Sequence, residues 1–391
     1  MTPGPRTPAP RPSRSRPSGS AKFSSGPANR PSRHRAAGII AALAGGAGLI
    51  AALAWGRLSA VAAPEGAEWL GAELHSVALD RLTATVVVGA CLGIAGVLLR
   101  TATKNPLADP EITGVNSGAA FGAVLATTVT GSVGGAALLP GALAGAVVAA
   151  SATITFGMRG RAATSSAMAV QRMVLLGMAV SALFSALTAI ILVLDEAQLS
   201  TVLSWLSGRL GGVRMADVVP AMIVAAVVAP AVIAGARGLD ALVVGDSVAT
   251  AVGARPRLTR LLAVAAAVLL IAPCVAAAGP IGFLGLMAAV AAHRVCGPRH
   301  RSAVPVAAVL GAAVLLVADT VGQWLWAPAE TPVGIVTALI GVPVLLWGIG
   351  SLRGTRNAGT RNGGAPNRAT PETPTLPRPL NGRFASGEGS A

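Results

Sequence analysis

The stretch KNPLADPEITGVNSGAA, residues 104–120, separates two long apolar segments and decides how the chain folds around it. Pro106 and Pro110 stand four residues apart, and neither fits a helix interior because proline lacks the amide N–H and clashes with the preceding turn. Asn105 and Asp109 precede the prolines and favour a turn. The stretch therefore predicts that one helix ends, the chain turns, and a second helix starts.

Glycines open the second of these helices at a spacing of four, at Gly114, Gly118 and Gly122. That spacing puts them on one helix face, where a neighbouring helix can approach closely. The same spacing occurs in the two neighbouring apolar segments, at Gly89 with Gly93 and at Gly141 with Gly145. Tight helix packing is a sufficient explanation for the glycines alone.

The composition predicts an all-α, polytopic membrane protein. Of the 391 residues, 53% are hydrophobic and 12% are charged, and the mean hydropathy is +0.68; soluble domains carry about 25% charged residues. Apolar segments of about 20 residues, enough to cross a bilayer as a helix, recur along the chain. We predict ten spans, near residues 37–57, 82–99, 114–131, 134–157, 170–194, 217–234, 259–279, 282–296, 303–323 and 333–352. Between the fifth and sixth, the segment LSTVLSWLSGRLGG suits a short interfacial helix.

The distribution of basic residues predicts the orientation. If both termini are cytosolic, twelve of the sixteen Arg and Lys residues between the tails fall on the cytosolic side, as the positive-inside rule requires. The four exceptions on the outer side are Arg57, Arg81, Arg209 and Arg214. We therefore expect a multi-pass protein of the cell membrane with both ends inside.

Most of the net charge of +15 lies in two tails. Residues 1–35 carry +8 and residues 353–391 carry +4. Both are rich in Pro, Ser, Gly and Arg, which predicts disordered cytosolic tails on either side of a transmembrane domain at 36–352. The first tail holds one aromatic residue, Phe23, so we expect contact with anionic lipid and no nucleic-acid partner.

The whole 104–120 stretch resembles the signature of the FecCD-type permeases, the membrane subunits of ABC importers for iron–siderophore complexes, haem and cobalamin. Similar segments follow in the family's order at 177–190, 203–213, 279–287 and 328–347, so the resemblance covers residues 80–352. The signature positions are Asn105, Pro106, Leu107, Ala108, Asp109, Pro110, Gly114, Val115, Asn116, Ser117, Gly118 and Ala119.

The resemblance implies ten helices per subunit and a set of partners. These are a second permease subunit, identical or homologous, an ATP-binding subunit on the cytosolic side, and an extracytoplasmic substrate-binding protein. A ferric siderophore is the leading substrate, with cobalamin and haem as open alternatives. The permease itself would have no catalytic residues, no cofactor and no metal site.

Two groups of working residues follow from the resemblance. The family's ATPase-coupling segment, Gly-Glu-x-x-Ala-x-x-x-Gly, is matched within residues 239–254 by Gly245, Asp246, Ala249 and Gly253, with aspartate in place of the usual glutamate. Arg81 matches a family arginine near the contact with acidic residues of the binding protein, although a snorkelling interfacial arginine is an equal interpretation.

The sequence departs from the family pattern at four places. The usual Pro-Arg after Arg81 is Thr83-Ala84, and the outer arginine after Asp319 is Gln323. A Pro-His pair and a following Arg are replaced at Ala289, Val290 and His293, and an aspartate is replaced by Arg299. The missing outer arginine makes a heterodimer of two different permeases a reasonable hypothesis.

Asp319 is an acid inside a predicted span, which makes it a functional candidate, although a hydrogen bond near the helix end explains it equally well. His293 and His300 have no third ligand close in sequence, so we interpret them as solvated basic residues of a loop. The lysines, Lys22 and Lys104, lack the following Ser or Thr of a P-loop, so ATP hydrolysis must come from another chain. The alternative function is an ion-coupled secondary carrier, which predicts paired charges near the membrane midplane.

Overall fold

The part of each predicted span that the structure describes lies mainly on a helix, and no strand occurs among the described residues. The computed structural model describes residues 33–61, 68–105, 108–110, 114–131, 135–158, 166–194, 199–325 and 331–343. The two predicted tails lie almost wholly outside these residues, as do Pro106 and Leu107. The chain divides into two compact units, 1–338 and 339–391, and every contact discussed below lies within the first.

Seven helices are long and apolar enough to cross a membrane: α1 (Arg33–Ser59), α2 (Gly71–Thr103), α4 (Gly135–Met158), α5 (Ser166–Leu194), α7 (Met215–Ala234), α10 (Pro256–Ala278) and α12 (His300–Leu325). Three shorter apolar helices, α3 (Val115–Thr130), α11 (Leu284–Cys296) and Val333–Pro343, coincide with the remaining predicted spans. The prediction of an all-α membrane protein with about ten spans is confirmed.

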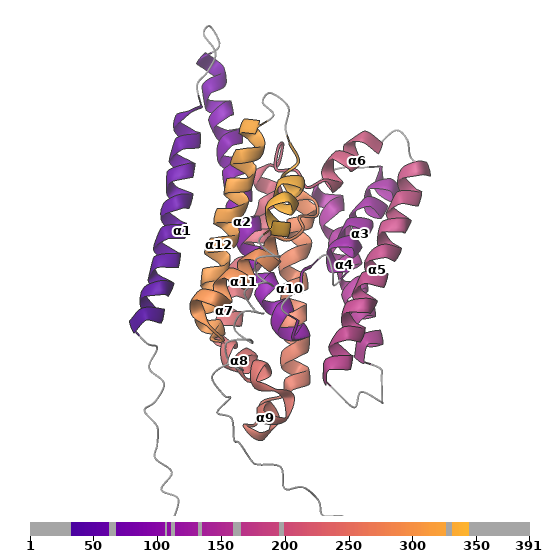
Figure 1. Cartoon of the computed structure of the whole chain (residues 1–391). Coiled ribbons are helices and arrows are strands. Elements are labelled where there is room, and N and C mark those ends of the chain that lie inside the picture. The colour runs from indigo at the N-terminus through magenta and orange to yellow at the C-terminus, as the bar shows by residue number, and fades with distance from the viewer. Residues whose placement is uncertain are drawn as a thin grey trace, which may run out of the picture. The chain divides into compact units, whose positions relative to one another are not determined.

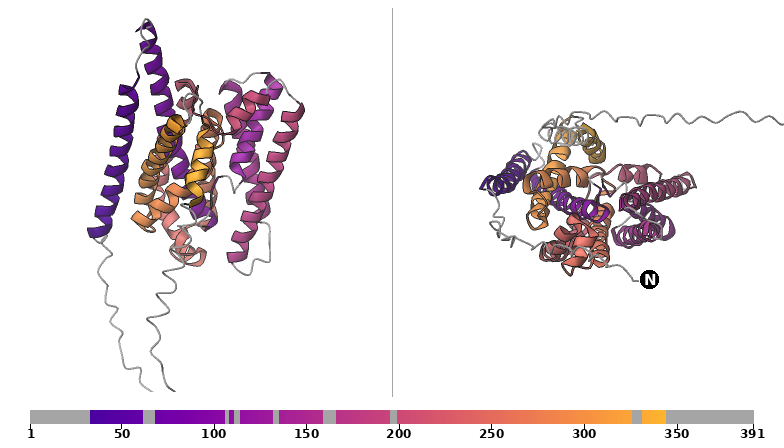
Figure 2. Two further views of the ribbon diagram at one scale, coloured as in Figure 1. Left: turned by 45° about the horizontal axis from the view of Figure 1, so that its top comes forward. Right: turned by 60° about the horizontal axis from the view of Figure 1, so that its bottom comes forward.

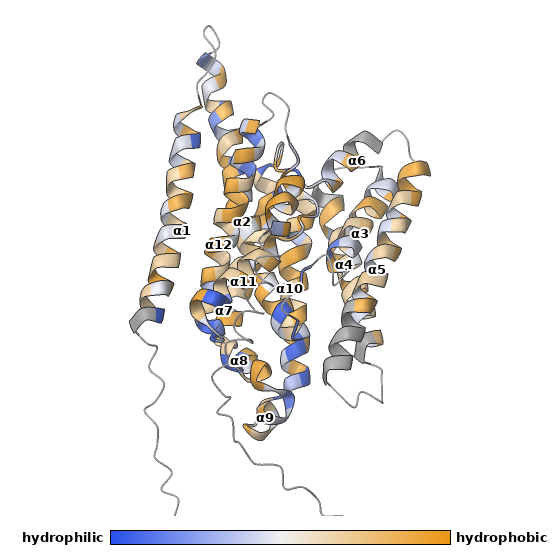
Figure 3. Cartoon of the chain, viewed as in Figure 1, coloured by the Kyte–Doolittle hydropathy of each residue, from blue (hydrophilic) through white to orange (hydrophobic). Residues whose placement is uncertain are grey.

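Four short helices connect these spans. A 3-10 turn, Glu68–Leu70, precedes α2, and α6 (Leu199–Leu206) forms the predicted short helix between the fifth and sixth spans. The polar segment after α7 contains two helices, α8 (Ala236–Val244) and α9 (Asp246–Ala251), which meet at Gly245. Figure 3 shows hydrophilic residues gathered around α8, α9 and the beginning of α10, whereas the spans are mainly hydrophobic.

The spans pack as two groups around α2 and α3. Helix α2 is the buried centre of one group and contacts α7, α10, α11 and α12, while α1 lies against α12 (Figure 1). Helices α3, α4 and α5 form the other group, and α10 contacts both α3 and α4. Both views of Figure 2 show the same grouping.

Glycines set the closest helix contacts, as their spacing predicts. A Cβ atom added to Gly118 of α3 would lie 2.5 Å from the carbonyl oxygen of Gly145 in α4, and one added to Gly122 would lie 2.9 Å from the Gly145 Cα. On α2, a Cβ added to Gly89 would lie 2.7 Å from the carbonyl oxygen of Gly311 in α12. These distances are too short for any side chain, so in both pairs, α3 with α4 and α2 with α12, the helix backbones approach through glycine.

Candidate functional sites at the two ends of α2 and α12

The signature stretch follows the end of α2 and is hydrogen-bonded to the beginning of α11. The Asp109 carboxylate is 2% exposed, and its Oδ2 accepts a hydrogen bond of 3.3 Å from the backbone N–H of Leu286. That N–H belongs to the first turn of α11, where the helix dipole favours a negative group. Leu286 lies in the 279–287 segment. Two segments that resemble the family pattern, and that lie far apart in the sequence, therefore meet here.

The chain then turns into α3 through Gly114. This glycine has φ +78°, in the left-handed region, and its Cβ position lies 3.0 Å from Val180 and 3.1 Å from the carbonyl oxygen of Gly177. A side chain at this residue would be strained and crowded at once. In the described part of the stretch, α2 ends at Thr103, Asp109 anchors the turn on α11, and Gly114 allows α3 to start.

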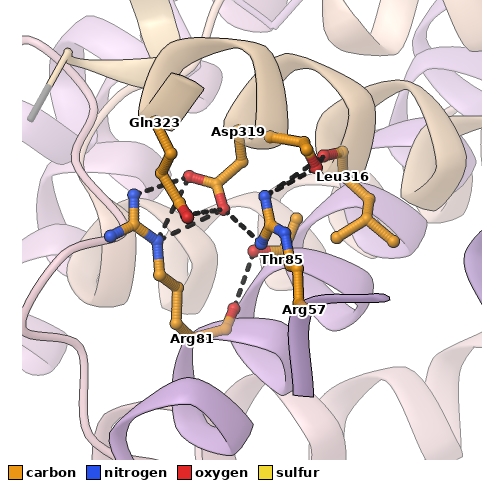
Figure 4. Close-up of polar contacts among 7 residues, drawn as sticks. Arg57, Arg81, Thr85, Leu316, Asp319 and Gln323 are labelled. Carbon is orange, nitrogen blue, oxygen red and sulfur yellow. Dashed lines mark hydrogen bonds and ion pairs between the residues drawn. The ribbon is translucent and has the colours of Figure 1, made fainter. Parts of the chain in front are cut away.

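A cluster of charged residues lies at the end of α12 that carries Asp319; we call it the Asp319 end. Asp319 is 2% exposed and receives two guanidinium groups (Figure 4). Arg57 of α1 donates from Nη1 to Oδ2 at 2.7 Å, and Arg81 of α2 donates from Nη2 to Oδ1 at 2.9 Å. Gln323 donates to Oδ2 at 3.0 Å, and a second Arg57 nitrogen donates to the Thr320 hydroxyl at 2.7 Å.

This cluster joins three helices through one buried carboxylate. Both arginine side chains are mostly buried, with 15% and 17% exposed. Neither interpretation of Asp319 included this arrangement, which is a buried ion pair with arginines of α1 and α2. The sequence reasoning missed Arg57, which lies in the first span and outside the resemblance. Its signal was available: an arginine on the side where basic residues are scarce, at the level of an acid inside a span, suggests a pair.

The other end of the α2–α12 pair carries α8 and α9; we call it the Asp246 end. Gly245 has φ +136° between the two helices, Asp246 begins α9, Ala249 is 1% exposed, and Gly253 has φ +79° after α9. The predicted coupling residues therefore lie together on one short helix and its two turns.

Asp246 ties α9 to two other elements. Its Oδ1 receives Nζ of Lys104 at 2.9 Å and Nη2 of Arg260 at 3.2 Å. Partial burial alone would raise the pKa of Asp246, but the hydrogen bond and charge of Lys104, together with Arg260, lower it below its ordinary value. Asp246 is therefore ionised at neutral pH and holds the signature lysine at the coupling segment.

A second polar group at this end centres on His300, the first residue of α12. The ring is 0% exposed, with Nδ1 2.7 Å from Oδ1 of Asp240 in α8 and Nε2 2.6 Å from the hydroxyl of Thr101 in α2. Its backbone N–H also donates to Asp240 at 2.8 Å. The interpretation of His300 as solvated was wrong, because the ring is enclosed by three helices. His293 is half-buried and packs edge-on against His300 at 5.5 Å.

Among the described residues, no group of three or more His, Cys, Asp and Glu side chains is arranged to hold a metal ion. The polar groups are instead ion pairs and hydrogen bonds between helices. Together, the apolar spans, the crowded glycine contacts and a polar, partly exposed segment at one end define a class of protein: a polytopic helical membrane protein.

Comparisons with known proteins identify the family. The FecCD transport family matches residues 36–350. The cobalamin import system permease protein BtuC of Halobacterium salinarum is 38% identical over 273 residues, which cover 70% of this chain and 72% of that protein. The iron(3+)-hydroxamate import system permease protein FhuG of Bacillus subtilis is 34% identical over 282 residues, covering 70% of this chain and 82% of that protein.

A solved structure of a metal-chelate type ABC transporter in an inward-facing conformation matches with a TM-score of 0.67 and 26% identity, over 80% of this chain and 98% of that one. This chain belongs to the FecCD transport family. The resemblance that the signature stretch suggested is confirmed, and so is the function of a membrane permease.

Proposed function

We propose that this chain is the permease subunit of an ABC importer that carries a metal chelate, a ferric siderophore foremost, into the cytoplasm. The family match from residue 36 to residue 350 carries the proposal, and the iron(3+)-hydroxamate relative and the metal-chelate type structure support the substrate class. The orientation follows from the basic residues: the Asp246 end faces the cytoplasm and the Asp319 end faces outward.

The α8–α9 segment is the proposed docking surface for an ATP-binding subunit. It lies outside the spans, yet it exposes four valines, which are 47% to 70% exposed: Val243, Val244, Val248 and Val252. An apolar patch on a segment that is otherwise polar favours contact with another protein. Gly245, Asp246, Ala249 and Gly253 would hold this surface in shape, and the fixed salt bridges of Asp246 would pass ATPase closure to the spans.

Purification of the tagged chain from its own cells in mild detergent tests this contact. We expect an ATP-binding chain to co-purify, and the double variant Val248→Asp/Val252→Asp to lose it. Val77→Asp is the matched control, because Val77 is 50% exposed on α2, near the Asp319 end. Retention of the ATP-binding chain by the double variant would reject α8–α9 as its docking surface.

The Asp319 end is the proposed contact for a substrate-binding protein. Two guanidinium groups surround one carboxylate, so the cluster has an excess of one positive charge that suits an acidic partner surface. Arg81 would take part from an orientation fixed by Asp319. We expect Arg81→Gln to slow association with the binding protein, more so at low salt, while Arg214→Gln has little effect; equal rates for both variants would reject this role.

A second permease subunit, identical or homologous, completes the proposed transporter. Two copies of this chain with different tags, expressed together, decide the composition. Capture of one tag by the other in a complex that contains the ATP-binding chain would show a homodimer. A different permease in place of the second copy would show a heterodimer, in line with the glutamine at position 323.

Uptake measurements test the substrate and the alternative of an ion-coupled carrier. Cells that depend on this chain are given a radioactive ferric hydroxamate, haem or cobalamin, each in turn. We expect ferric hydroxamate uptake that stops when ATP is depleted and persists when the proton gradient is collapsed. The reverse dependence would favour the carrier. That alternative predicts paired charges near the midplane, whereas Asp319, which binds the two arginines, lies within the last two turns of α12.

A further inference from the structure

Helices α2 and α12 form an antiparallel pair that is tied at both ends. At one end Arg81 of α2 is paired with Asp319 of α12, and at the other Thr101 of α2 is bonded to His300 of α12. His300 and Asp319 are separated by roughly 28 Å along α12, from the rise of 1.5 Å per residue. Between them the backbones touch at Gly89 and Gly311, so the two helices have little freedom to slide past each other.

His300 is also the direct link from this pair to α8. Asp240 accepts two hydrogen bonds from the same residue, one from the His300 backbone N–H at 2.8 Å and one from the ring at 2.7 Å. A carboxylate only accepts, so Nδ1 carries a proton toward Asp240. Nε2 lies 2.6 Å from the Thr101 hydroxyl, whose single proton can go either to Nε2 or to the Val97 carbonyl of its own helix, at 2.8 Å. The ring therefore links Asp240 and Thr101 directly, with both within hydrogen-bond distance.

Helix α8 has a buried side and an exposed side, and Asp240 lies between them. Leu239 and Leu242 are 4% and 0% exposed and anchor the helix, while Val243 and Val244 are exposed. The Asp240 side chain is 38% exposed, so it connects the exposed side of α8 with a fully buried histidine. Any displacement of α8 by a partner must either carry His300 with it or break two hydrogen bonds.

We propose that His300 is the positioning residue through which the α8–α9 segment moves the α2–α12 pair as one body. The link runs from Asp240 on α8, through the ring of His300, to Thr101 on α2. It passes motion at the Asp246 end to Asp319 at the opposite end. The role in transport rests on the proposed function, whereas the mechanical link between α8 and the α2–α12 pair does not depend on it.

Hydrogen exchange on the purified full-length chain tests the link itself. We expect Asp240→Ala to speed exchange of the protected amides of α8 and of the first turn of α12 by about tenfold, because the two hydrogen bonds from His300 to Asp240 are lost. Asp240→Asn retains an acceptor oxygen and is expected to restore most of the protection. His293→Gln is the control, because His293 packs edge-on against His300 but its ring is hydrogen-bonded to its own helix, at the Ala289 carbonyl.

Unchanged exchange in α8 for Asp240→Ala would overturn the proposal, and so would an equal increase in all helices, which would indicate general destabilisation. His300→Ala is measured alongside. It removes a fully buried ring and can fail to fold for that reason alone. In that case Asp240→Ala, which changes a partly exposed side chain, decides the result.

The second measurement uses the complete transporter in proteoliposomes, with a ferric hydroxamate as the probe. We expect Asp240→Ala to reduce uptake per ATP hydrolysed by about tenfold while ATP hydrolysis stays within about twofold of the unmodified protein, and Asp240→Asn to recover much of the ratio. A parallel loss of uptake and hydrolysis would overturn the positioning role. If the unmodified chain yields no ATP-binding partner, the proposed function fails, and the exchange result still decides whether the link exists.

Discussion

Asp319 balances two buried cations, and its removal should cost far more than the removal of its neutral neighbour. We expect Asp319→Ala to lower the free energy of unfolding by about 3–5 kcal/mol, because Arg57 and Arg81 then lack a counter-charge. Gln323→Ala removes one hydrogen bond to the same carboxylate and should cost about 1 kcal/mol. Thermal unfolding in one detergent measures both. Similar shifts for the two variants would mean that the charge of Asp319 contributes nothing.

The same cluster explains an exception in the basic residues. Arg57 and Arg81 are two of the four arginines that the predicted orientation leaves on the outer side, and both are held by Asp319. Gln323, which stands where the family pattern has an arginine, also belongs to this cluster, because its amide donates a hydrogen bond to the Asp319 carboxylate. The sequence showed each residue separately, but not that α1 brings Arg57 to them, since nothing in a chain of apolar residues specifies which helix packs against which.

Asp246 gives a pH-dependent prediction. Its pKa is below the ordinary value of 3.8 in the folded protein, so its salt bridges stabilise the fold fully above that value. This stabilisation is lost as the pH falls through the lower, folded pKa. Because the carboxylate is 48% exposed, we expect only about 0.2–1 kcal/mol in total.

Asp246→Asn provides the comparison for this effect. The melting temperature of the variant should lie slightly below that of the unmodified chain at pH 7, and the difference should shrink once the solution is more acidic than pH 3.8. Asp240→Asn is measured in parallel as the control, because the Asp240 carboxylate is hydrogen-bonded to His300 and not to Lys104. A difference that grows towards acid pH would contradict the assignment of the two cations to Asp246.

At the scale of helices, the apolar segments and the glycine spacing predicted most of what the structure contains. Segment length and hydropathy identified the spans because a bilayer-sized apolar helix has few alternatives. The spacing in α3 and α4 predicted a close contact, and Gly122 indeed faces Gly145. The short helices were less predictable: Gly245 divides the segment at 239–254 between α8 and α9. The meeting of Asp240 with His300, sixty residues apart, left no periodic signal in the sequence.

The contact between α3 and α4 gives a prediction at this scale. A Cβ added to Gly145 would lie 3.0 Å from the Cα of Gly122 and even closer to the backbone of Gly118, so the helices must separate to accept it. We expect Gly145→Ala to destabilise the protein by about 1–3 kcal/mol through overpacking. Gly45 in α1 has no atom within 4 Å of its Cβ position, so Gly45→Ala should be neutral or slightly stabilising. Unfolding that is equally sensitive to both changes would contradict the glycine contact.

For the whole molecule, the structure separates two polar ends that the sequence analysis treated as unrelated groups of residues. Lys104, which opens the signature stretch, belongs to the same end as Asp246, because their side chains form a salt bridge across 142 residues of sequence. The signature stretch therefore has two roles in the fold: its aspartate anchors α11, and its lysine holds α9. An importer needs such continuity, since a motion at the Asp246 end has to reach the Asp319 end through packed helices.

The direction of transport depends on which of these two ends faces the cytoplasm. Labelling of single introduced cysteines can determine this orientation. The native cysteines, Cys91, Cys274 and Cys296, are all buried, so they give a low background of labelling. Val77→Cys reports on the Asp319 side of α2 and Val248→Cys on α9, at 50% and 47% exposure of the native valines. With a membrane-impermeant maleimide we expect labelling of the first in intact spheroplasts and of the second only after permeabilisation. Labelling in the reverse order would place α8–α9 outside the cell, where no ATP-binding subunit is available, and the importer proposal would then have to be abandoned.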